Sequence, residues 1–154
     1  MHELAFAALS WRAAPMPGAR PVEMALLPKL PDNGFRAFVR FPAGWSRAEV
    51  GHYAVAEEFL VLEGELALNG EAWKKGDLAW IPARQRRHGL HTRTGCLVFA
   101  WFGATPRWIR GDPAQAPAGG RNRTSIEGRT LVRLLPGARE TLNLDDYAWR
   151  AVPA

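Results

Sequence analysis

The stretch from His52 to Gly64 contains the residues best suited to chemistry. It brings an imidazole together with a carboxylate, because Glu57 follows His52 by five residues at the start of an apolar run. Side chains in a β-strand alternate between two faces, so Glu57 shares the face of Phe59 and Glu58 takes the opposite one. A carboxylate in an apolar interior is unfavourable unless a metal or a proton compensates it. The stretch therefore predicts one half of a metal site.

The elements around this stretch have the pattern of short strands joined by tight turns. Apolar and alternating runs predict strands over residues 22–27, 35–41, 57–62, 65–68, 71–74, 78–81, 96–102 and 130–135, with 35–41 half-buried. Glu63-Gly64 is predicted to close a hairpin between 57–62 and 65–68, and Asn69-Gly70 to close the next one. Residues 141–149 fit either a further strand or a helical turn. Many short strands with glycine and proline turns predict an all-β sandwich or barrel.

Length and composition favour a single domain with its own core. The chain has 154 residues, 47% of them hydrophobic and 23% charged, and no apolar run long enough to span a membrane. The first residues make a poor signal peptide and Cys96 is the only cysteine, so the cytoplasm is the expected location. The net charge of +5 comes mostly from scattered arginines without interleaved aromatic residues, which does not favour a nucleic-acid-binding surface.

Two spaced motifs give the chain a resemblance to a known superfamily. Their residues are, in chain order, Gly44, His52, Glu57, Gly64, Gly76 and Pro82, with His88 six positions further on. The spacing is similar to that of the two cupin motifs over residues 36–103, and VLEGE and KKGDLAWIPA are strong local matches. The proline-rich entry and the GCLVFAWF run most resemble the ChrR-like cupins, which include anti-sigma-factor metal domains and aromatic-ketone dioxygenases. The resemblance implies a small β-barrel of the jelly-roll type.

The resemblance also implies a divalent transition metal at the mouth of the barrel, bound by two or three histidines and one glutamate. On this chain it implies His52 and Glu57 from the first motif and His88 from the second, with His91 as an alternative. Imidazole and carboxylate ligands suit Fe, Mn, Ni, Cu or Zn, and three ligands leave positions open for a substrate or oxygen.

The chain departs from the motif pattern at two places. Val50 stands where the first histidine of the first motif is expected. In the second motif Arg84 replaces a glycine, and one extra residue puts Arg87, rather than His88, in the strict histidine position. Either the loop bulges so that His88 takes this position, or the motif has lost its ligand. Glu57 has its own alternative, as a barrel-mouth residue paired with an arginine rather than a metal ligand.

The run RQRR at residues 84–87 has two interpretations. Such a run is typically a solvated loop, but arginines at a barrel mouth can hold a substrate carboxylate through bidentate hydrogen bonds. Arg84 and Arg87 are the candidates for this contact. Tyr53 and Trp101 are the candidate aromatic contacts for a ligand.

Three functions remain open on the sequence alone. The resemblance implies a metal-dependent dioxygenase acting on a small aromatic or carboxylate substrate; the alternatives are a non-catalytic cupin that senses a ligand or metal, and a metal-free barrel. The expected organisation is one domain, with an N-terminal extension at 1–35, the barrel core at 36–103 and a C-terminal loop and strand extension at 104–154. A homodimer is expected because uncovered sheet edges invite aggregation.

Overall fold

The computed structural model describes residues 2–5, 8–27, 34–117, 124–126, 129–131 and 149–152, with side chains over 8–27 and 34–117. The strands are β1 (His2–Ala5), β2 (Arg12–Met16), β3 (Ala19–Leu26), β4 (Phe35–Phe41), β5 (Ser46–Arg47), β6 (Gly51–Tyr53), β7 (Glu57–Leu68), β8 (Glu71–Lys74), β9 (Leu78–Ile81), β10 (Leu90–His91), β11 (Cys96–Phe102), β12 (Trp108–Arg110), β13 (Thr124–Ile126), β14 (Arg129–Leu131) and β15 (Trp149–Val152). Among these residues there is no helix long and apolar enough to cross a membrane.

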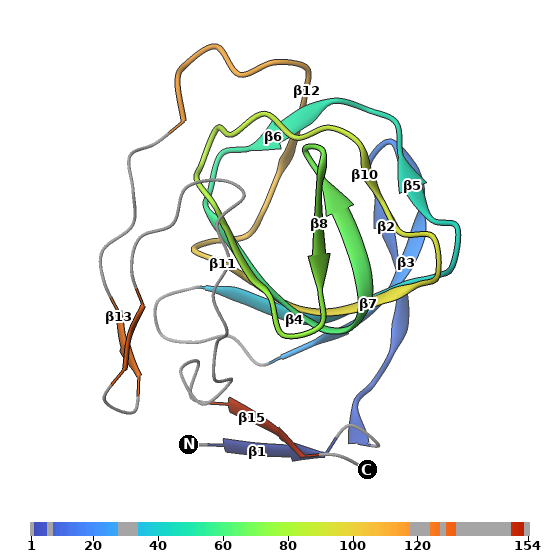
Figure 1. The fold of residues 1–154 in the computed structure, drawn as a ribbon, viewed down its shortest axis with the longest axis vertical. Helices are drawn as coiled ribbons and strands as arrows, with labels where there is room; N and C mark the ends of the chain where they lie inside the picture. Colours follow the sequence, from blue (N-terminus) through green and yellow to red (C-terminus); the bar gives the residue numbers. More distant parts are fainter. Residues whose placement is uncertain are drawn as a thin grey trace.

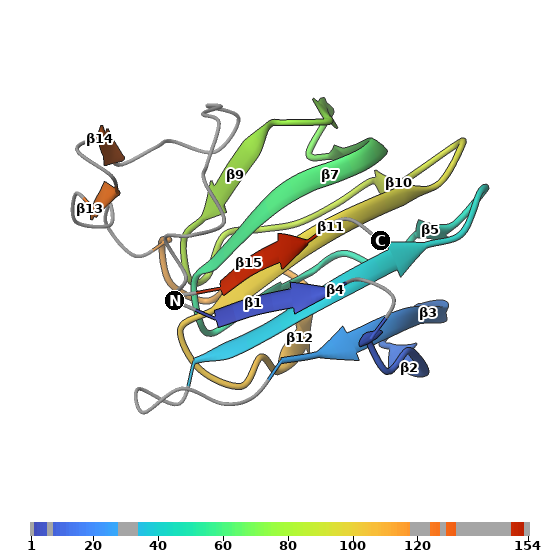
Figure 2. The same cartoon turned by 90° about the horizontal axis from the view of Figure 1, so that it is seen from below.

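The strands curl into a closed barrel (Figure 1). Strand β10 pairs with both β5 and β7, which closes a ring in the order β10-β5-β3-β4-β11-β7, and every pairing in it is antiparallel. β3 belongs to this ring although it lies within the predicted N-terminal extension. β1 and β15 pair in parallel and lie outside β4 and β11 (Figure 2). The prediction of an all-β barrel with strand-like extensions is confirmed.

Strand β7 corrects one prediction about the centre of the chain. Glu63-Gly64 does not close a hairpin, because Glu57–Leu68 is one continuous strand that pairs with β11 as far as Gly64 and with β8 beyond it. The register along β11 shifts between Leu97 and Val98, and Gly64 beside this bulge has a φ of +75°. A glycine with positive φ is favoured next to a β-bulge as well as in a turn, and here the bulged strand bends around the barrel.

The other strand predictions are confirmed with small changes in extent. Asn69-Gly70 forms the two-residue turn between β7 and β8, with φ of +53° and +79°. The first part of β4 is buried on both faces rather than half-buried, since Arg36 on its outer face is only 2% exposed, whereas Arg40 further along that face is exposed. Residues 132–135 of the last predicted strand lie outside the described residues, as do residues 141–148.

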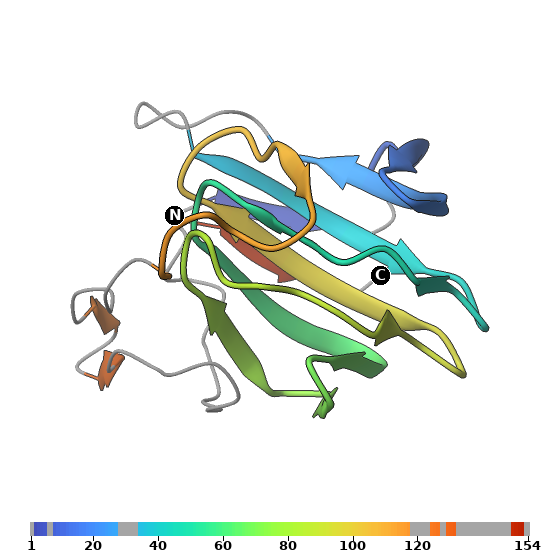
Figure 3. The same cartoon turned by 90° about the horizontal axis from the view of Figure 1, so that it is seen from above.

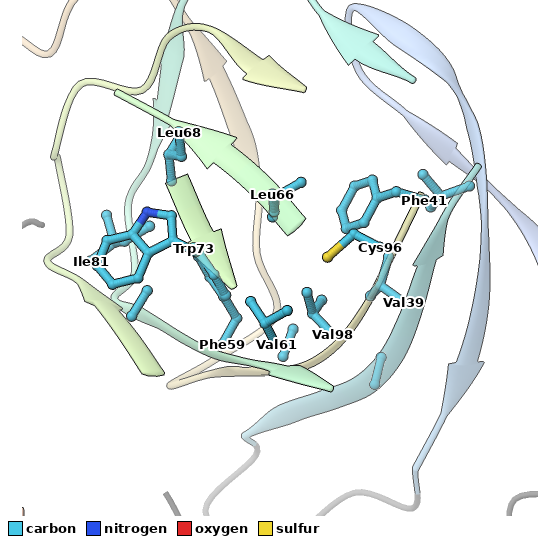
Figure 4. Packing of buried hydrophobic residues seen from close by; sticks show 14 of the residues in the cluster. Val39, Phe41, Phe59, Val61, Leu66, Leu68, Trp73, Ile81, Cys96 and Val98 are labelled. Carbon is cyan, nitrogen blue, oxygen red and sulfur yellow. The ribbon is translucent and has the colours of Figure 1, made fainter. Parts of the chain in front are cut away.

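The core fills the inside of the barrel, with a smaller apolar cluster on the outer face of the sheet. Side chains from several strands meet inside it, among them Phe41, Phe59, Leu66, Trp73 and Val98 (Figure 4). Alternate residues of the same strands, including Phe38 and Phe99, form the outer cluster. Because side chains alternate along each strand, the continuous apolar run of β11 serves both clusters at once.

Cys96 is buried at the start of β11, and its thiol is held in the neutral form. Burial, and secondarily the charge of Glu65, raise the pKa of Cys96 from an ordinary value of 9.0 to about 12. A thiol whose pKa is raised on folding adds stability below the unfolded pKa, and this stability is lost as the pH rises toward the folded pKa.

We therefore expect Cys96 to resist a thiol-specific reagent at pH 8 until the chain is unfolded in guanidinium chloride, because the thiolate is the reactive form. The free energy of unfolding should fall between pH 9 and pH 12 more steeply in the wild type than in Cys96→Ala, which has no thiol to ionise. Equal slopes in the two proteins, or rapid labelling of the folded chain, would contradict a neutral buried thiol.

Candidate functional site

The barrel holds a cavity of about 270 Å³, with Tyr53 of β6 and Trp108 of β12 on its wall. Most of its wall is apolar and is contributed by strands on all sides of the ring. The wall includes Met24, Phe41, Phe59, Leu90, Val98 and Phe102. Pro106 and Trp108, from the segment that follows β11, complete the wall where β12 pairs with β6 (Figure 3). This combination of an enclosed apolar space and a few polar groups is typical of a small-molecule site.

Glu57 and Arg87 form the first polar contact of the cavity. Glu57 lies on the cavity side of β7 with Phe59, as the alternation predicts, while Glu58 lies on the outer face, where it is buried. Nη1 of Arg87 donates to a carboxylate oxygen of Glu57, and the two side chains are only 6% and 12% exposed. The guanidinium is thus the partner that compensates the buried carboxylate.

The backbone around Arg87 explains why this side chain faces inward. The backbone N–H of Arg87 donates to the carbonyl of Gly51 at 2.8 Å, and that of Gly51 donates to the carbonyl of Arg87 at 3.2 Å. This isolated bridge ties the second-motif loop to β6. The guanidinium carbon lies 4.7 Å from the ring centroid of Tyr53, which also lines the cavity.

Arg47 is a second cation on the cavity wall, and the sequence did not single it out. Its side chain is 3% exposed, and its guanidinium carbon lies 4.1 Å from the ring centroid of Trp108. Its Nη2 approaches only the sulfur of Met16, at 4.0 Å, and its buried Nε has no hydrogen-bond partner. No local pattern pointed to it, because β5 has only two residues and Trp45, just before it, lies outside the strand.

Of the four candidate substrate-binding residues, two line the cavity and two do not. Arg87 and Tyr53 are on the wall. Arg84 is half-buried, with its Nε donating to the carbonyl of Ala116 at 3.0 Å. Trp101 lies on the outer side of β11, because its neighbours Ala100 and Phe102 face inward.

The three candidate histidines do not meet Glu57. His52 is buried, and its Nδ1 lies 3.1 Å from the carbonyl oxygen of Gly111. The ring of His52 therefore lies on the face of β6 opposite to the face that carries Tyr53. His88 is exposed, and its backbone N–H donates to Oδ1 of Asn69. His91 is also exposed, with its Nδ1 2.9 Å from the carbonyl oxygen of Gly89.

Comparison with known proteins identifies the fold. No protein-family model and no curated protein sequence matches the chain. The polyketide cyclase RemF from Streptomyces resistomycificus matches with a TM-score of 0.59 and 18% identity, over 71% of this chain and 84% of that one. An acetylacetone dioxygenase from Acinetobacter johnsonii matches with a TM-score of 0.53 and 14% identity, over 80% of this chain and 78% of that one.

The anti-sigma ChrR of Rhodobacter sphaeroides, solved in complex with SigE, matches with a TM-score of 0.52 and 18% identity, over 63% of this chain and 51% of that one. The chain has the cupin fold. It spans about half of the ChrR chain and 38% of another matched chain, from Nostoc punctiforme. The expected likeness to ChrR-like cupins is confirmed at the level of the fold.

In this cupin barrel the donor set does not fit the divalent metal that the motifs imply. Over 8–27 and 34–117 no group of three or more His, Cys, Asp or Glu side chains is placed to hold a metal ion. The carboxylate of Glu57 is taken by Arg87, and Arg87 stands in the strict histidine position of the second cupin motif. A guanidinium is always protonated and offers no lone pair to a metal.

Gly51 explains how the cupin barrel admits the wall residue Trp108. A Cβ at Gly51 would overlap the indole of Trp108 and lie 2.6 Å from the carbonyl oxygen of Ile109. Only a residue without a side chain allows β12 to pair so closely with β6.

We expect Gly51→Ala to push β12 and Trp108 away from the barrel and to lower the free energy of unfolding by roughly 1–3 kcal/mol, as overpacking does. The measurement is chemical denaturation together with tryptophan fluorescence, which should shift to longer wavelength as Trp108 becomes solvated. Gly103→Ala is the control, because Gly103, like Gly51, has no positive φ and a Cβ there would meet only the indole of Trp101, at 3.9 Å. An unchanged emission spectrum in Gly51→Ala would show that β12 does not depend on this close approach.

Proposed function

We propose that this chain is a cupin-fold protein that binds a small organic molecule with an apolar or aromatic body inside its barrel. The observation that carries the proposal is the enclosed apolar cavity with Tyr53, Glu57 and Arg87 on its wall. At about 270 Å³ it lies just below the usual range for ligand pockets, roughly 300–1,000 Å³, so a ligand built on a single ring fits best.

A metal-dependent dioxygenase is the second candidate, because the spacing of Gly44, His52, Glu57 and Gly64 resembles the first cupin motif. A divalent metal in such a site would supply binding and activation of oxygen and substrate. The residues present do not support it, since Glu57 is paired with Arg87 and the ring of His52 is engaged by Gly111. The binding function therefore has priority.

The binding function is tested with a panel of single-ring compounds, both charged and neutral, observed by ligand-detected NMR and thermal shift. Leu90→Trp, on the cavity wall, should reduce the affinity of every binder at least tenfold because the larger ring fills the space. Leu62→Trp is the matched control, since Leu62 is a half-buried leucine packed on the outer cluster. No binder in the panel, or equal losses in both variants, would overturn the proposal.

Metal content separates the two candidates. Mass spectrometry of untagged protein, after reconstitution with Fe(II), Mn, Ni, Cu and Zn, should find no stoichiometric metal in the wild type, His52→Ala, Glu57→Gln or His88→Ala. Stoichiometric metal in the wild type that is lost in Glu57→Gln would establish the metal site and give priority to the dioxygenase.

A further inference from the structure

We infer that the cavity selects a ligand with a single negative charge, and that Arg47 is the residue that recognises its anionic group. This inference rests on the proposed binding function and adds the chemical class of the ligand: a small monocarboxylate with an apolar or aromatic body. The argument starts from the charges on the cavity wall.

The cavity wall carries one positive charge in excess. In the part of the chain that the structure describes, the charged side chains on this wall are Arg47, Arg87 and Glu57. Arg87 and Glu57 form an ion pair and cancel each other. The carboxylate of Glu49, an acidic group beside Trp108, accepts from Nε1 of Trp108 at 2.6 Å and pairs with Arg110 at 2.7 Å. Among the described residues, no carboxylate pairs with Arg47.

The surroundings of Arg47 leave its charge without compensation. Its guanidinium has an aromatic ring on one face and a thioether sulfur, a weak acceptor, at 4.0 Å. A cation–π contact offsets only part of the penalty for removing a charge from water. A ligand anion in the cavity can supply the missing negative charge. Burying the cation beside an apolar cavity is then explained by recognition rather than by stability.

A row of stacked groups holds both guanidinium planes in fixed positions. Arg47 lies over Trp108, Trp108 contacts Tyr53 edge-to-face with centroids 5.2 Å apart, and Arg87 lies over Tyr53. Nε and Nη2 of Arg87 also lack partners, so this residue adds donors without adding net charge. A preorganised planar fork suits a carboxylate, which it can bind through two parallel hydrogen bonds.

The charge count favours a carboxylate over a phosphate monoester. One excess positive charge matches a carboxylate, whereas a phosphate monoester carries about −1.5 to −2 at pH 7 and would leave a buried negative charge. The apolar remainder of the wall takes the body of the ligand.

The test compares carboxylates with their neutral amides: benzoate with benzamide and phenylacetate with phenylacetamide, each titrated by calorimetry and NMR. In the wild type the carboxylates should bind more tightly than the amides and than phenyl phosphate. Arg47→Met should weaken the carboxylates by roughly ten- to a hundredfold, the loss of a charge-assisted hydrogen bond, and leave the amides unchanged.

Arg40→Met is the matched control, because Arg40 also lies over an indole, Trp11 at 4.0 Å, but outside the cavity. Arg47→Lys keeps the charge and should keep part of the preference for carboxylates. This variant keeps the inference testable if Arg47→Met does not fold. Amides that bind as tightly as carboxylates, with no effect of Arg47→Met, would overturn the inference while the binding function stands. Failure of acids and amides alike to bind would remove the binding function and the inference with it.

Discussion

Gly64→Ala is expected to lower the free energy of unfolding by roughly 3–5 kcal/mol, as the sum of backbone strain and overpacking. A Cβ at Gly64 would overlap the carbonyl oxygen of Gly95 and come within 3.1 Å of Cα of Cys96. Strand β11, which carries Cys96, is held between β4 and β7 and cannot move away without losing its pairing on one side. Chemical denaturation followed by circular dichroism measures the loss.

Gly70→Ala is the matched control for the strain at Gly64. The two glycines have nearly the same φ, +75° and +79°, but a Cβ at Gly70 meets nothing within 4 Å. Its substitution should therefore show only the backbone cost, about 1–2 kcal/mol. The difference between the two variants isolates the close approach of β11. Equal losses would mean that the bulge of β7 can open at little cost.

The same glycine shows why the fold could be predicted in outline but not in detail. Period-two patterns and the Asn69-Gly70 pair located the central strands β3, β4, β7, β8, β9 and β11, because these signals are local, but not the short strands β5, β6, β10 and β12. The backbone at Gly64, beside the bulge of β7, was predicted as a hairpin turn, since both structures favour a glycine with positive φ. Only the pairing with β11, more than thirty residues away in the sequence, decides between them.

Whether a candidate side chain points into or out of the barrel was predictable where the residue lies on a long strand. Glu57 lies at the start of the twelve-residue strand β7, so its inward position followed from the alternation. An arginine partner for Glu57 was one of the open interpretations, but the sequence did not show that this arginine is Arg87. His52 and Arg47 lie on strands of three and two residues, β6 and β5, whose phase is set by their partners. Too few residues alternate there to show which face is inside.

Glu57→Gln is expected to destabilise the protein by roughly 3–5 kcal/mol, because it leaves the buried guanidinium of Arg87 without its counter-ion. The side chain keeps its shape, so the loss reports charge rather than packing. Denaturation in guanidinium chloride measures the free energy of unfolding. Arg87→Met should cost a similar amount, since it leaves the carboxylate unpaired in the same apolar wall.

The double variant Glu57→Leu with Arg87→Met is expected to be much closer to the wild type than Glu57→Leu or Arg87→Met alone. Replacing a buried ion pair by apolar groups of similar volume is often neutral or stabilising. The coupling between the two positions should therefore be strongly favourable in a double-mutant cycle. Additive losses would show that the two side chains contribute independently to the free energy of unfolding and that their ion pair does not couple them.

The affinity of Glu57→Gln for a monocarboxylate, higher or lower than that of the wild type, distinguishes a recognition site from a structural ion pair. Removing the carboxylate raises the excess charge on the cavity wall from one to two, because Arg47 and Arg87 then both lack an anion. A monocarboxylate should bind this unstable variant more tightly than the wild type and restore more stability at the same concentration, as mass action requires. Leu62→Trp, with its altered outer cluster, should gain no more from the ligand than the wild type. If benzoate binds Glu57→Gln more weakly than the wild type, the count of charges on the wall does not govern recognition, and the ligand's anionic group contacts something other than the two arginines.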